Sequence, residues 1–148
     1  MQLKKLMENK DLEKWQKEWM GLSKKGIRFI HRESEEYPER FRVLLDSPVG
    51  FYLKGQMPLQ SQRNIAIVGA RNASTYGIEI AQYFSRGLAK AGMNIISGLA
   101  YGIDKQAHIG AMEVGGYTLG ILGCGINICY PKENYTLFDK MQHFGGMK

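Results

Sequence analysis

The stretch from Asn64 to Asp104 constrains the fold most, because it alternates short apolar runs with glycine-rich turns. An apolar run at 65–68 ends in a glycine loop and leads into a helical stretch. A second apolar run at 93–96 then ends in another glycine loop. This order is typical of a βαβ unit, whose long crossover makes the two strands parallel. Both loops therefore leave the carboxyl edge of one sheet, where ligands bind in open α/β folds.

The same pattern continues toward the C-terminus. The spacing of apolar residues predicts helices from Ser74 to Ala91, from Ile103 to Val114 and from about Glu133 to Gln142. A third parallel strand is expected at 117–122, and it leads into a third glycine loop at 123–127. The chain is therefore predicted to be an α/β protein, with a Rossmann-like parallel sheet and helices on both faces. The first helix is expected to bury an apolar face made of Ile80, Ala81, Phe84, Leu88 and Ala91.

The residues before this unit have a different character. Residues 1–20 are predicted to form a charged helix, on which Trp15 and Trp19 share one face, and a basic turn is expected at 21–26. Two short strands are expected at 27–30 and 49–53, the second entering the main sheet or pairing at its edge. We divide the chain into a helical extension, residues 1–25, and a Rossmann-like domain, residues 26–148.

Between these two strands, the segment 33–46 is predicted to contain a helix. Pro38 is placed to open it, because proline is favoured in the first turn of a helix. The apolar face of this helix is expected to consist of Phe41, Leu44 and Leu45.

Charge and cysteine content limit the classes of function. The chain of 148 residues carries 20 Lys and Arg against 14 Asp and Glu, and this net charge of +6 favours a polyanionic partner. A basic protein without such a partner is the plainer alternative. The two cysteines, Cys124 and Cys129, have no nearby histidine pair, so reduced thiols in a cytoplasmic protein are expected rather than a zinc site. No apolar run reaches the length of about 18 residues that a membrane span requires.

The glycine loops are candidate anion sites, because glycine lets a phosphate approach the N–H groups at a helix N-terminus. Their alternative role is to make tight turns. The motif of a dinucleotide site is missing after the first strand, and the second strand ends in Ser97 where an acidic residue would hold a ribose. The lone Gly123-x-Gly125 is a weak signal, and the P-loop motif is absent. No cofactor is expected.

Individual polar residues at this edge suggest anion binding more than catalysis. Arg71 could grip phosphate oxygens, Lys132 offers a second cation, and Ser97 with Gly98 could offer a hydroxyl and an open N–H. A surface arginine, a solvated lysine and a helix cap are the alternatives. Asp104 and His108 lie four apart on one helical face, which indicates a structural pair. No Ser/His/Asp set, paired carboxylates or metal cluster is evident, so an enzyme is not expected.

Several motifs in order resemble the DNA-processing protein A (DprA/Smf) family. They cover roughly residues 26–134 and include Gly69-Ala70-Arg71 with Ser74-x-Tyr76-Gly77, then Ser97-Gly98-Leu99-Ala100-x-Gly102-Ile103-Asp104, and Leu122-Gly123-x-Gly125 with Tyr130-Pro131-Lys132-x-Asn134. The resemblance implies a Rossmann-like fold that binds single-stranded DNA without a cofactor. It also implies a role in natural transformation and in bringing the recombinase RecA to single strands, with self-association in the full-length proteins.

Carried over by position, the resemblance makes Arg71 and Lys132 the phosphate-binding residues. It places other DNA-binding positions at Gly69, Ser97, Gly98, Gly123, Gly125 and Asn134. The family sheet continues beyond the third glycine loop, whereas this sequence stops at Lys148. The sheet is therefore expected to be incomplete relative to the family. Two alternatives stay open: a nucleoside-phosphate hydrolase of the lysine-decarboxylase-like group, whose Pro-Gly-Gly-x-Gly-Thr-x-x-Glu motif is missing, and a truncated remnant without function.

Overall fold

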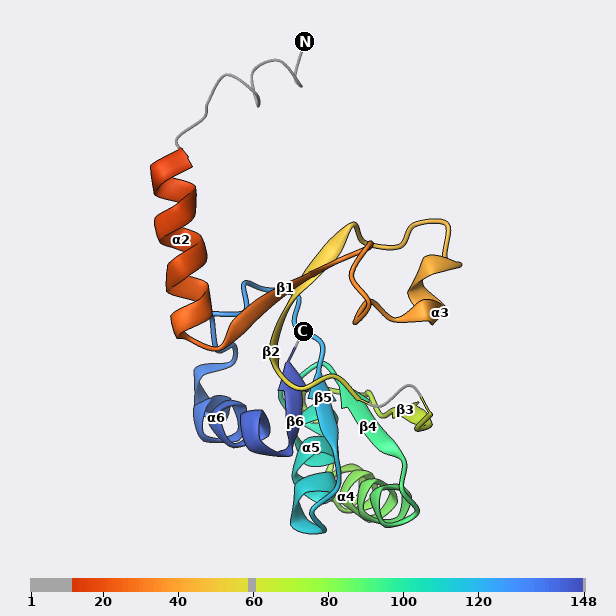
Figure 1. Cartoon of the computed structure of the whole chain (residues 1–148). Coiled ribbons are helices and arrows are strands. Elements are labelled where there is room, and N and C mark those ends of the chain that lie inside the picture. Colours follow the sequence, from red (N-terminus) through yellow and green to blue (C-terminus); the bar gives the residue numbers. More distant parts are fainter. Residues whose placement is uncertain (1–11, 59–60, 148) are drawn as a thin grey trace.

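The computed structural model describes residues 12–58 and 61–147 and shows a single sheet with helices packed on it (Figure 1). The N-terminal half of the described chain contains α2 (Leu12–Lys24), β1 (Ile27–His31), α3 (Glu39–Arg42), β2 (Gly50–Gly55) and β3 (Asn64–Ala66). The C-terminal half contains α4 (Thr75–Lys90), β4 (Asn94–Ser97), α5 (Ile103–Glu113), β5 (Thr118–Gly120), the 3₁₀ turn η1 (Lys132–Asn134), α6 (Tyr135–Phe144) and β6 (Gly145–Met147).

The sheet has the strand order β1-β2-β6-β5-β4-β3. The strands β6, β5, β4 and β3 are parallel to one another, while β2 runs antiparallel to both β6 and β1. The predicted α/β class and the three parallel strands are confirmed. The strand β6 was not predicted, because its Gly145-Gly146-Met147 sequence carries little β propensity and pairs through its backbone.

The helices α4 and α5 pack against each other through small residues. A Cβ at Gly110 would lie 2.8 Å from the Gln82 carbonyl oxygen, and the Ser85 hydroxyl donates a 2.5 Å hydrogen bond to the Ala107 carbonyl oxygen. This close approach buries Ala81, Ser85 and Ala89, and it leaves Phe84 55% exposed. The predicted apolar face of α4 is therefore wrong at Phe84 and at Ala91, which is also exposed. Backbone proximity rather than side-chain bulk decides which face is covered.

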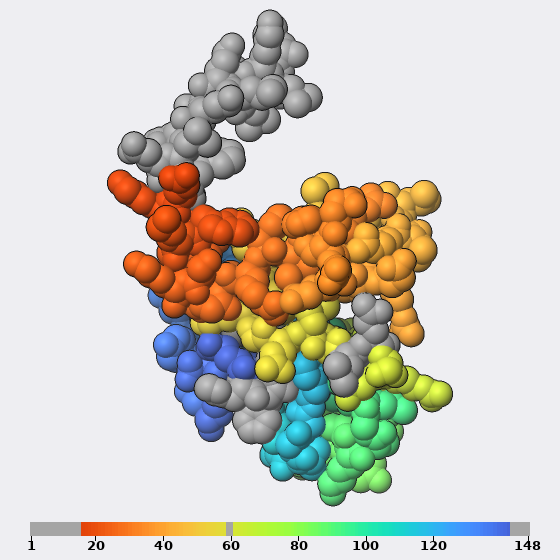
Figure 2. All heavy atoms as spheres, in the orientation of Figure 1, coloured from red at the N-terminus to blue at the C-terminus, as the bar shows by residue number. Residues whose placement is uncertain are grey.

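The elements from α2 to β2, which we call the lead-in layer, extend the same sheet beyond β6, because β2 pairs with β6. In Figure 2 the residues of α2 to β2 that are drawn in red to yellow make the upper part of the coloured surface, and the residues from β3 onward make much of the lower part. Ile30, Tyr37 and Leu53 form a small buried core in this layer. The strand prediction for both arms of the β1-β2 hairpin is confirmed.

Two predictions in this layer need correction. The first helix continues through Lys24, so the expected basic turn is confined to Lys25 and Gly26. Trp19 is 55% exposed, and its ring and that of Phe29 lie in a T-shaped arrangement with centroids 6.4 Å apart. The segment of the predicted helix before Leu12, and the packing of Trp15, lie outside what the structure describes.

The helix predicted around Pro38 is also shorter than expected. Pro38 is its N-cap, α3 ends at Arg42, and both Leu44 and Leu45 are exposed. The chain turns away because Arg42 donates hydrogen bonds to the carbonyl oxygens of Arg32 and Ser34. These bonds hold the segment as a compact loop rather than a longer helix.

A series of buried hydrogen bonds lies between the parallel strands β4 and β5 and the helix α5. The Thr118 hydroxyl donates to the Ile95 carbonyl oxygen and accepts from Nδ1 of the buried His108, so Nε2 carries no proton and is left without a partner in the described part of the chain. Burial lowers the pKa of His108 to about 3. The structural role predicted for His108 is supported, although its hydrogen bond goes to Thr118 and not to Asp104.

This buried imidazole predicts an acid-sensitive fold. The folded-state pKa of about 3 is lower than the ordinary histidine pKa of 6.5, so the contribution of His108 to stability is complete above pH 6.5 and falls as the pH drops toward 3. The free energy of unfolding should fall by roughly 1 kcal/mol per pH unit below 6.5. Urea titrations at pH 7 and pH 5 measure it, and His108→Gln should remove most of the difference. An identical pH dependence in both proteins would contradict this role of His108.

Candidate nucleic-acid interface

Three glycine-containing loops leave the same edge of the parallel strands. The ladder extends one residue beyond β3 and β5, because Ile67 N–H donates to the Ile96 carbonyl oxygen and Ile121 N–H donates to the Ser97 carbonyl oxygen. The loops therefore begin side by side, as the sequence predicted. We call these segments, residues 67–74, 98–102 and 122–134, the loop edge.

The first two loops are in direct backbone contact. Ile103 N–H donates to the Ala70 carbonyl oxygen, and Gly102 adopts a φ of 69° beside the carbonyl groups of Ala70 and Arg71. A Cβ at Gly69 would lie 2.7 Å from Cγ1 of Ile103. The glycines at these positions thus allow the first loop to pack against the start of α5.

The carboxylate of Asp104 ties the same two loops together. Its Oδ1 accepts from Gly69 N–H at 3.3 Å, and its Oδ2 accepts from Gly98 N–H at 3.1 Å. The expectation that Gly98 presents an open N–H is therefore wrong, because Asp104 already occupies that donor. The buried Ser97 hydroxyl donates to the Ile67 carbonyl oxygen at 2.6 Å, so it too is engaged inside the protein.

Replacing this carboxylate should loosen the loop edge. In Asp104→Asn one of the two N–H donors would face an NH₂ group instead of an oxygen, and an unpaired buried donor costs about 1–3 kcal/mol. We expect a loss of that size in the free energy of unfolding, measured in urea, with faster amide exchange at Gly69 or Gly98. Asp139→Asn, on the exposed face of α6, is the matched control. Equal stability of the two variants would contradict the bridging role.

The second loop is joined to η1 by side-chain hydrogen bonds. The buried Asn134 side chain donates to the carbonyl oxygens of Leu99 and Ala100, at 2.9 and 3.3 Å. The Tyr101 hydroxyl donates to a Glu133 carboxylate oxygen at 2.5 Å. This bond raises the pKa of Tyr101 and lowers the pKa of Glu133. Asn134 is thus a tie between two parts of the loop edge.

The two predicted phosphate-binding residues, Arg71 and Lys132, lie on the two segments that contact the second loop. Arg71 directly follows Ala70, whose carbonyl oxygen accepts the hydrogen bond from Ile103 N–H. Lys132 directly precedes Glu133 and Asn134, whose side chains are hydrogen-bonded to the second loop. Both side chains are exposed, and neither makes a hydrogen bond or ion pair within the described residues. The contacts therefore place the segments of Arg71 and Lys132 beside one shared loop.

The third loop contains a tight turn, in which Ile128 N–H donates to the Gly125 carbonyl oxygen at 2.8 Å. A Cβ at Gly125 would lie 2.9 Å from Oδ1 of Asn127, whereas a Cβ at Gly123 would meet nothing within 4 Å. Both glycines are exposed. They differ in this respect from Asn134 and Ser97, whose side chains are buried.

Aromatic side chains at this edge were not predicted as functional. Four tyrosines are exposed there, from 38% to 72%: Tyr76 in the first turn of α4, Tyr101 in the second loop, Tyr130 in the third and Tyr135 at the start of α6. The available signal was their position next to glycine loops and outside the predicted apolar faces. Their rings are large planar surfaces open to solvent.

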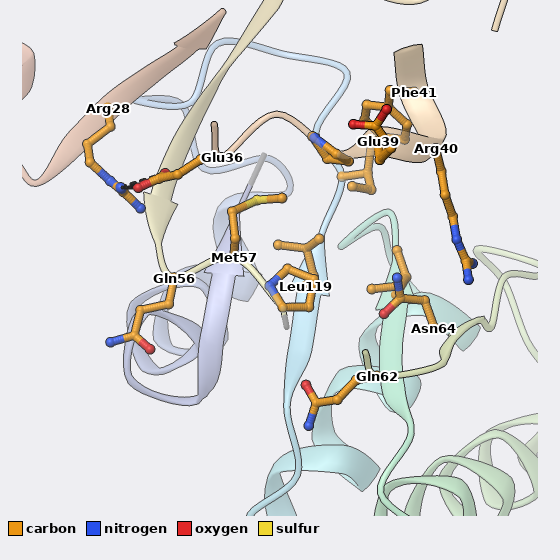
Figure 3. A pocket seen from close by; sticks show the side chains of 14 residues that line it. Arg28, Glu36, Glu39, Arg40, Phe41, Gln56, Met57, Gln62, Asn64 and Leu119 are labelled. Carbon is orange, nitrogen blue, oxygen red and sulfur yellow. Dashed lines mark hydrogen bonds and ion pairs between the residues drawn. The ribbon is translucent and has the colours of Figure 1, made fainter. Parts of the chain in front are cut away.

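A separate cavity lies on another part of the described structure. It measures about 760 Å³, and its floor includes Ile96, Leu119 and Ile121 on the sheet face away from α4 and α5. Figure 3 shows Arg28 paired with Glu36 on one side of this cavity and Arg40 on the other. None of its lining residues belongs to the loop edge. The cavity marks the sheet face opposite the α4–α5 layer.

The described residues offer neither a membrane span nor a metal site. No helix among them combines the length and the apolar character needed to cross a bilayer. Within the same residues, no three His, Cys, Asp or Glu side chains are grouped so that they could hold a metal ion.

Comparison with known proteins gives consistent relatives. The family described as DNA recombination-mediator protein A matches residues 28–147. The DNA processing protein DprA of Bacillus subtilis is 37% identical over 117 residues, which are 78% of this chain and 39% of that protein. Protein Smf of Escherichia coli is 34% identical, over 79% of this chain and 31% of that protein. The chain thus spans less than half the length of these relatives.

Solved structures agree with the sequence comparisons. DNA processing protein A of Streptococcus pneumoniae superposes with a TM-score of 0.73 at 31% identity, over 86% of this chain and 46% of that one. The Helicobacter pylori protein, described for its single-stranded DNA binding mode, gives a TM-score of 0.71 at 27% identity, over 82% and 54% of the two chains. The chain belongs to the DNA recombination-mediator protein A family, as its motifs and its fold both indicate.

Proposed function

We propose that the loop edge binds single-stranded DNA. One observation carries the proposal: Arg71 and Lys132 are exposed and make no ion pair within the described residues, and they lie on the same linked loops as the exposed tyrosines. Hydrogen bonds from Tyr101 and Asn134 link these loops. A strand of DNA offers phosphates and unstacked bases, and proteins bind it by combining positive charge with aromatic surfaces. The net charge of +6 favours the same class of partner.

The phosphate contacts are assigned to exposed groups. Arg71 can present a forked pair of donors to phosphate oxygens, and Lys132 a mobile point charge. The exposed Gly123 and Gly125 leave room for the backbone of the strand to approach. The other predicted positions are assigned a supporting role: Gly69, Ser97, Gly98 and Asn134. Their polar groups already form hydrogen bonds inside the protein, and the two glycines leave no room for a side chain.

The base contacts are assigned to the tyrosines. Stacking of one base on an aromatic ring is worth about 1–3 kcal/mol and requires a base that is free of its partner. Because the bases of a duplex are already stacked and paired, the loop edge should bind single strands more tightly than duplex DNA. The single-stranded DNA binding mode described for the Helicobacter pylori relative supports the assignment by similarity.

The wider role is proposed for a protein that contains this chain. A part in DNA processing and natural transformation, contact with RecA and self-association follow from the family resemblance. The relatives are more than twice the length of the matched region, so these activities are assigned to the whole protein.

Tyr135 provides the test of base stacking, because it is 65% exposed and begins a helix. Tyr135→Ala should weaken binding of a fluorescent oligo-dT by roughly 5-fold or more, the effect of about 1 kcal/mol of stacking. Tyr135→Phe keeps the ring and should bind like the parent. Tyr83→Ala, which removes an exposed ring from the middle of α4, is the control. Parent-like binding by Tyr135→Ala would contradict the assignment of bases to this ring.

A further inference from the structure

The two cysteines of the chain lie at either end of one tight turn. Cys124 precedes Gly125 and Cys129 follows Ile128, the two residues joined by the hydrogen bond that closes the turn. A turn of this kind reverses the chain direction, so the residues on either side of it lie near each other. The third loop of the loop edge therefore brings the two thiols to the same place.

Side-chain contacts agree with this placement. The Cys124 thiol donates to the Ile128 carbonyl oxygen at 3.5 Å, and that oxygen belongs to the peptide that joins Ile128 to Cys129. The Cys124 sulfur is thus within about 6 Å of the Cys129 Cα by standard peptide dimensions. The two side chains are therefore close enough that rotation about their Cα–Cβ bonds can bring the sulfurs together.

The two thiols have different surroundings. Cys124 is exposed, while Cys129 is partly buried against the core cluster that contains Leu99 and Leu137. The Cys129 thiol donates to the Pro131 carbonyl oxygen at 3.4 Å, and burial raises its pKa. An oxidant from solvent reaches Cys124 first, and Cys129 is held nearby as the second thiol.

We propose that Cys124 and Cys129 form a redox-active dithiol that closes to a disulfide across the turn, with a hydroperoxide as oxidant. The Cys124 thiolate attacks one peroxide oxygen, the O–O bond breaks, and one water leaves after protonation. The Cys129 sulfur then displaces the hydroxyl of the Cys124 sulfenic acid as a second water. With hydrogen peroxide, the two thiols lose two electrons and two protons, and the peroxide is reduced to two molecules of water.

The bridge would act on the site next to it. Cys129 lies one residue before Tyr130 and three before Lys132, and a bond to Cys124 draws its sulfur away from the Pro131 carbonyl and the core cluster. This step rests on the proposed function: oxidation shifts Tyr130 and Lys132 and weakens binding of single-stranded DNA. The dithiol itself stands on the turn geometry alone.

The chemical test uses the reduced full chain with one equivalent of hydrogen peroxide, followed by alkylation and mass spectrometry without reductant. We expect a monomer that has lost two hydrogens, resists alkylation at both cysteines and is restored by dithiothreitol. Cys129→Ser should stop at a sulfenic acid on Cys124, trapped by dimedone, while Cys124→Ser should react far more slowly. Two alkylated cysteines, sulfinic acids or disulfide-linked dimers would overturn the proposal.

The functional test compares oligo-dT binding by the reduced and oxidised chains. Oxidation should weaken oligo-dT binding at least threefold, and dithiothreitol should restore it. The double variant Cys124→Ser/Cys129→Ser should bind with the same affinity before and after peroxide treatment. Unchanged affinity of the disulfide form would overturn the regulatory step. If the reduced chain binds no DNA although the disulfide forms, the proposed function fails and the dithiol stands. If DNA binds but no disulfide forms, the dithiol fails alone.

Discussion

Gly102→Ala is expected to destabilise the protein strongly and to disorganise the loop edge. The φ of 69° at Gly102 belongs to the left-handed region, which costs a residue with a side chain about 1–2 kcal/mol. The added Cβ would also collide with the Ala70 carbonyl oxygen and lie 2.6 Å from the Arg71 carbonyl oxygen. Both obstacles are backbone atoms, so the first loop must move. We expect a loss of about 3 kcal/mol or more in the free energy of unfolding.

Gly87→Ala is the matched control, because it makes the same chemical change inside α4. A Cβ at Gly87 meets nothing within 4 Å, and alanine is the better helix former by about 0.5–1 kcal/mol. Urea titrations should therefore move the unfolding midpoints of the two variants in opposite directions. Gly102→Ala unfolding like the parent would show that the first two loops do not pack as described.

Removal of the two cations should abolish most binding of single-stranded DNA. A hydrogen bond to a charged group is worth about 1.5–3 kcal/mol, so Arg71→Ala should weaken oligo-dT binding at least tenfold, and Lys132→Ala by a similar factor. The double variant should bind still more weakly. Fluorescence anisotropy with a labelled oligo-dT measures these affinities.

Two further variants separate position from charge. Arg71→Lys keeps the charge but loses the forked geometry, so it should fall between the parent and Arg71→Ala. Lys90→Ala removes one positive charge at the opposite end of α4 and should bind like the parent. If Lys90→Ala loses as much affinity as Arg71→Ala, binding depends on net charge and not on the loop edge.

The parallel unit was predictable because its strands and helices have strong local patterns. The helix limits at Ser74 and Ala91 coincide with the N-cap and C-cap of α4, where the Ser74 hydroxyl accepts from Gly77 N–H. The small residues Ala107 and Ala111 on α5, within the helix predicted from Ile103 to Val114, are buried. Glycine and capping residues act locally, so a sequence reveals them without tertiary information.

The parts that escaped prediction depend on contacts distant in sequence. Phe84 is exposed because Gly110 of another helix lets α4 approach along a different face. The Gly98 N–H is occupied because the carboxylate of Asp104 reaches back to it and also to Gly69, 35 residues earlier. The end of α3 at Arg42 likewise follows from bonds to Arg32 and Ser34, which no local pattern encodes.

The candidate site was predictable as a place more than as a set of contacts. The sequence located Arg71 and Lys132 beside glycine loops at one sheet edge, and the structure links those loops through Asp104, Tyr101 and Asn134. The sequence alone could not separate the residues that hold the loops together from the residues whose side chains remain exposed and unbonded. That distinction depends on where each hydrogen bond goes, and only coordinates reveal it. Whether the free residues contact DNA is still a prediction.

The central claim, that the loop edge binds the phosphates of a single strand, is tested most directly by the salt dependence of oligo-dT binding. Each phosphate contact should contribute about −0.7 to the slope of log affinity against log salt. With Arg71 and Lys132 both engaged, the parent should show a slope of about −1.4 or steeper, and the double alanine variant a slope shallower by about 1.4. No binding by the parent at low salt, or equal slopes for the two proteins, would contradict the account.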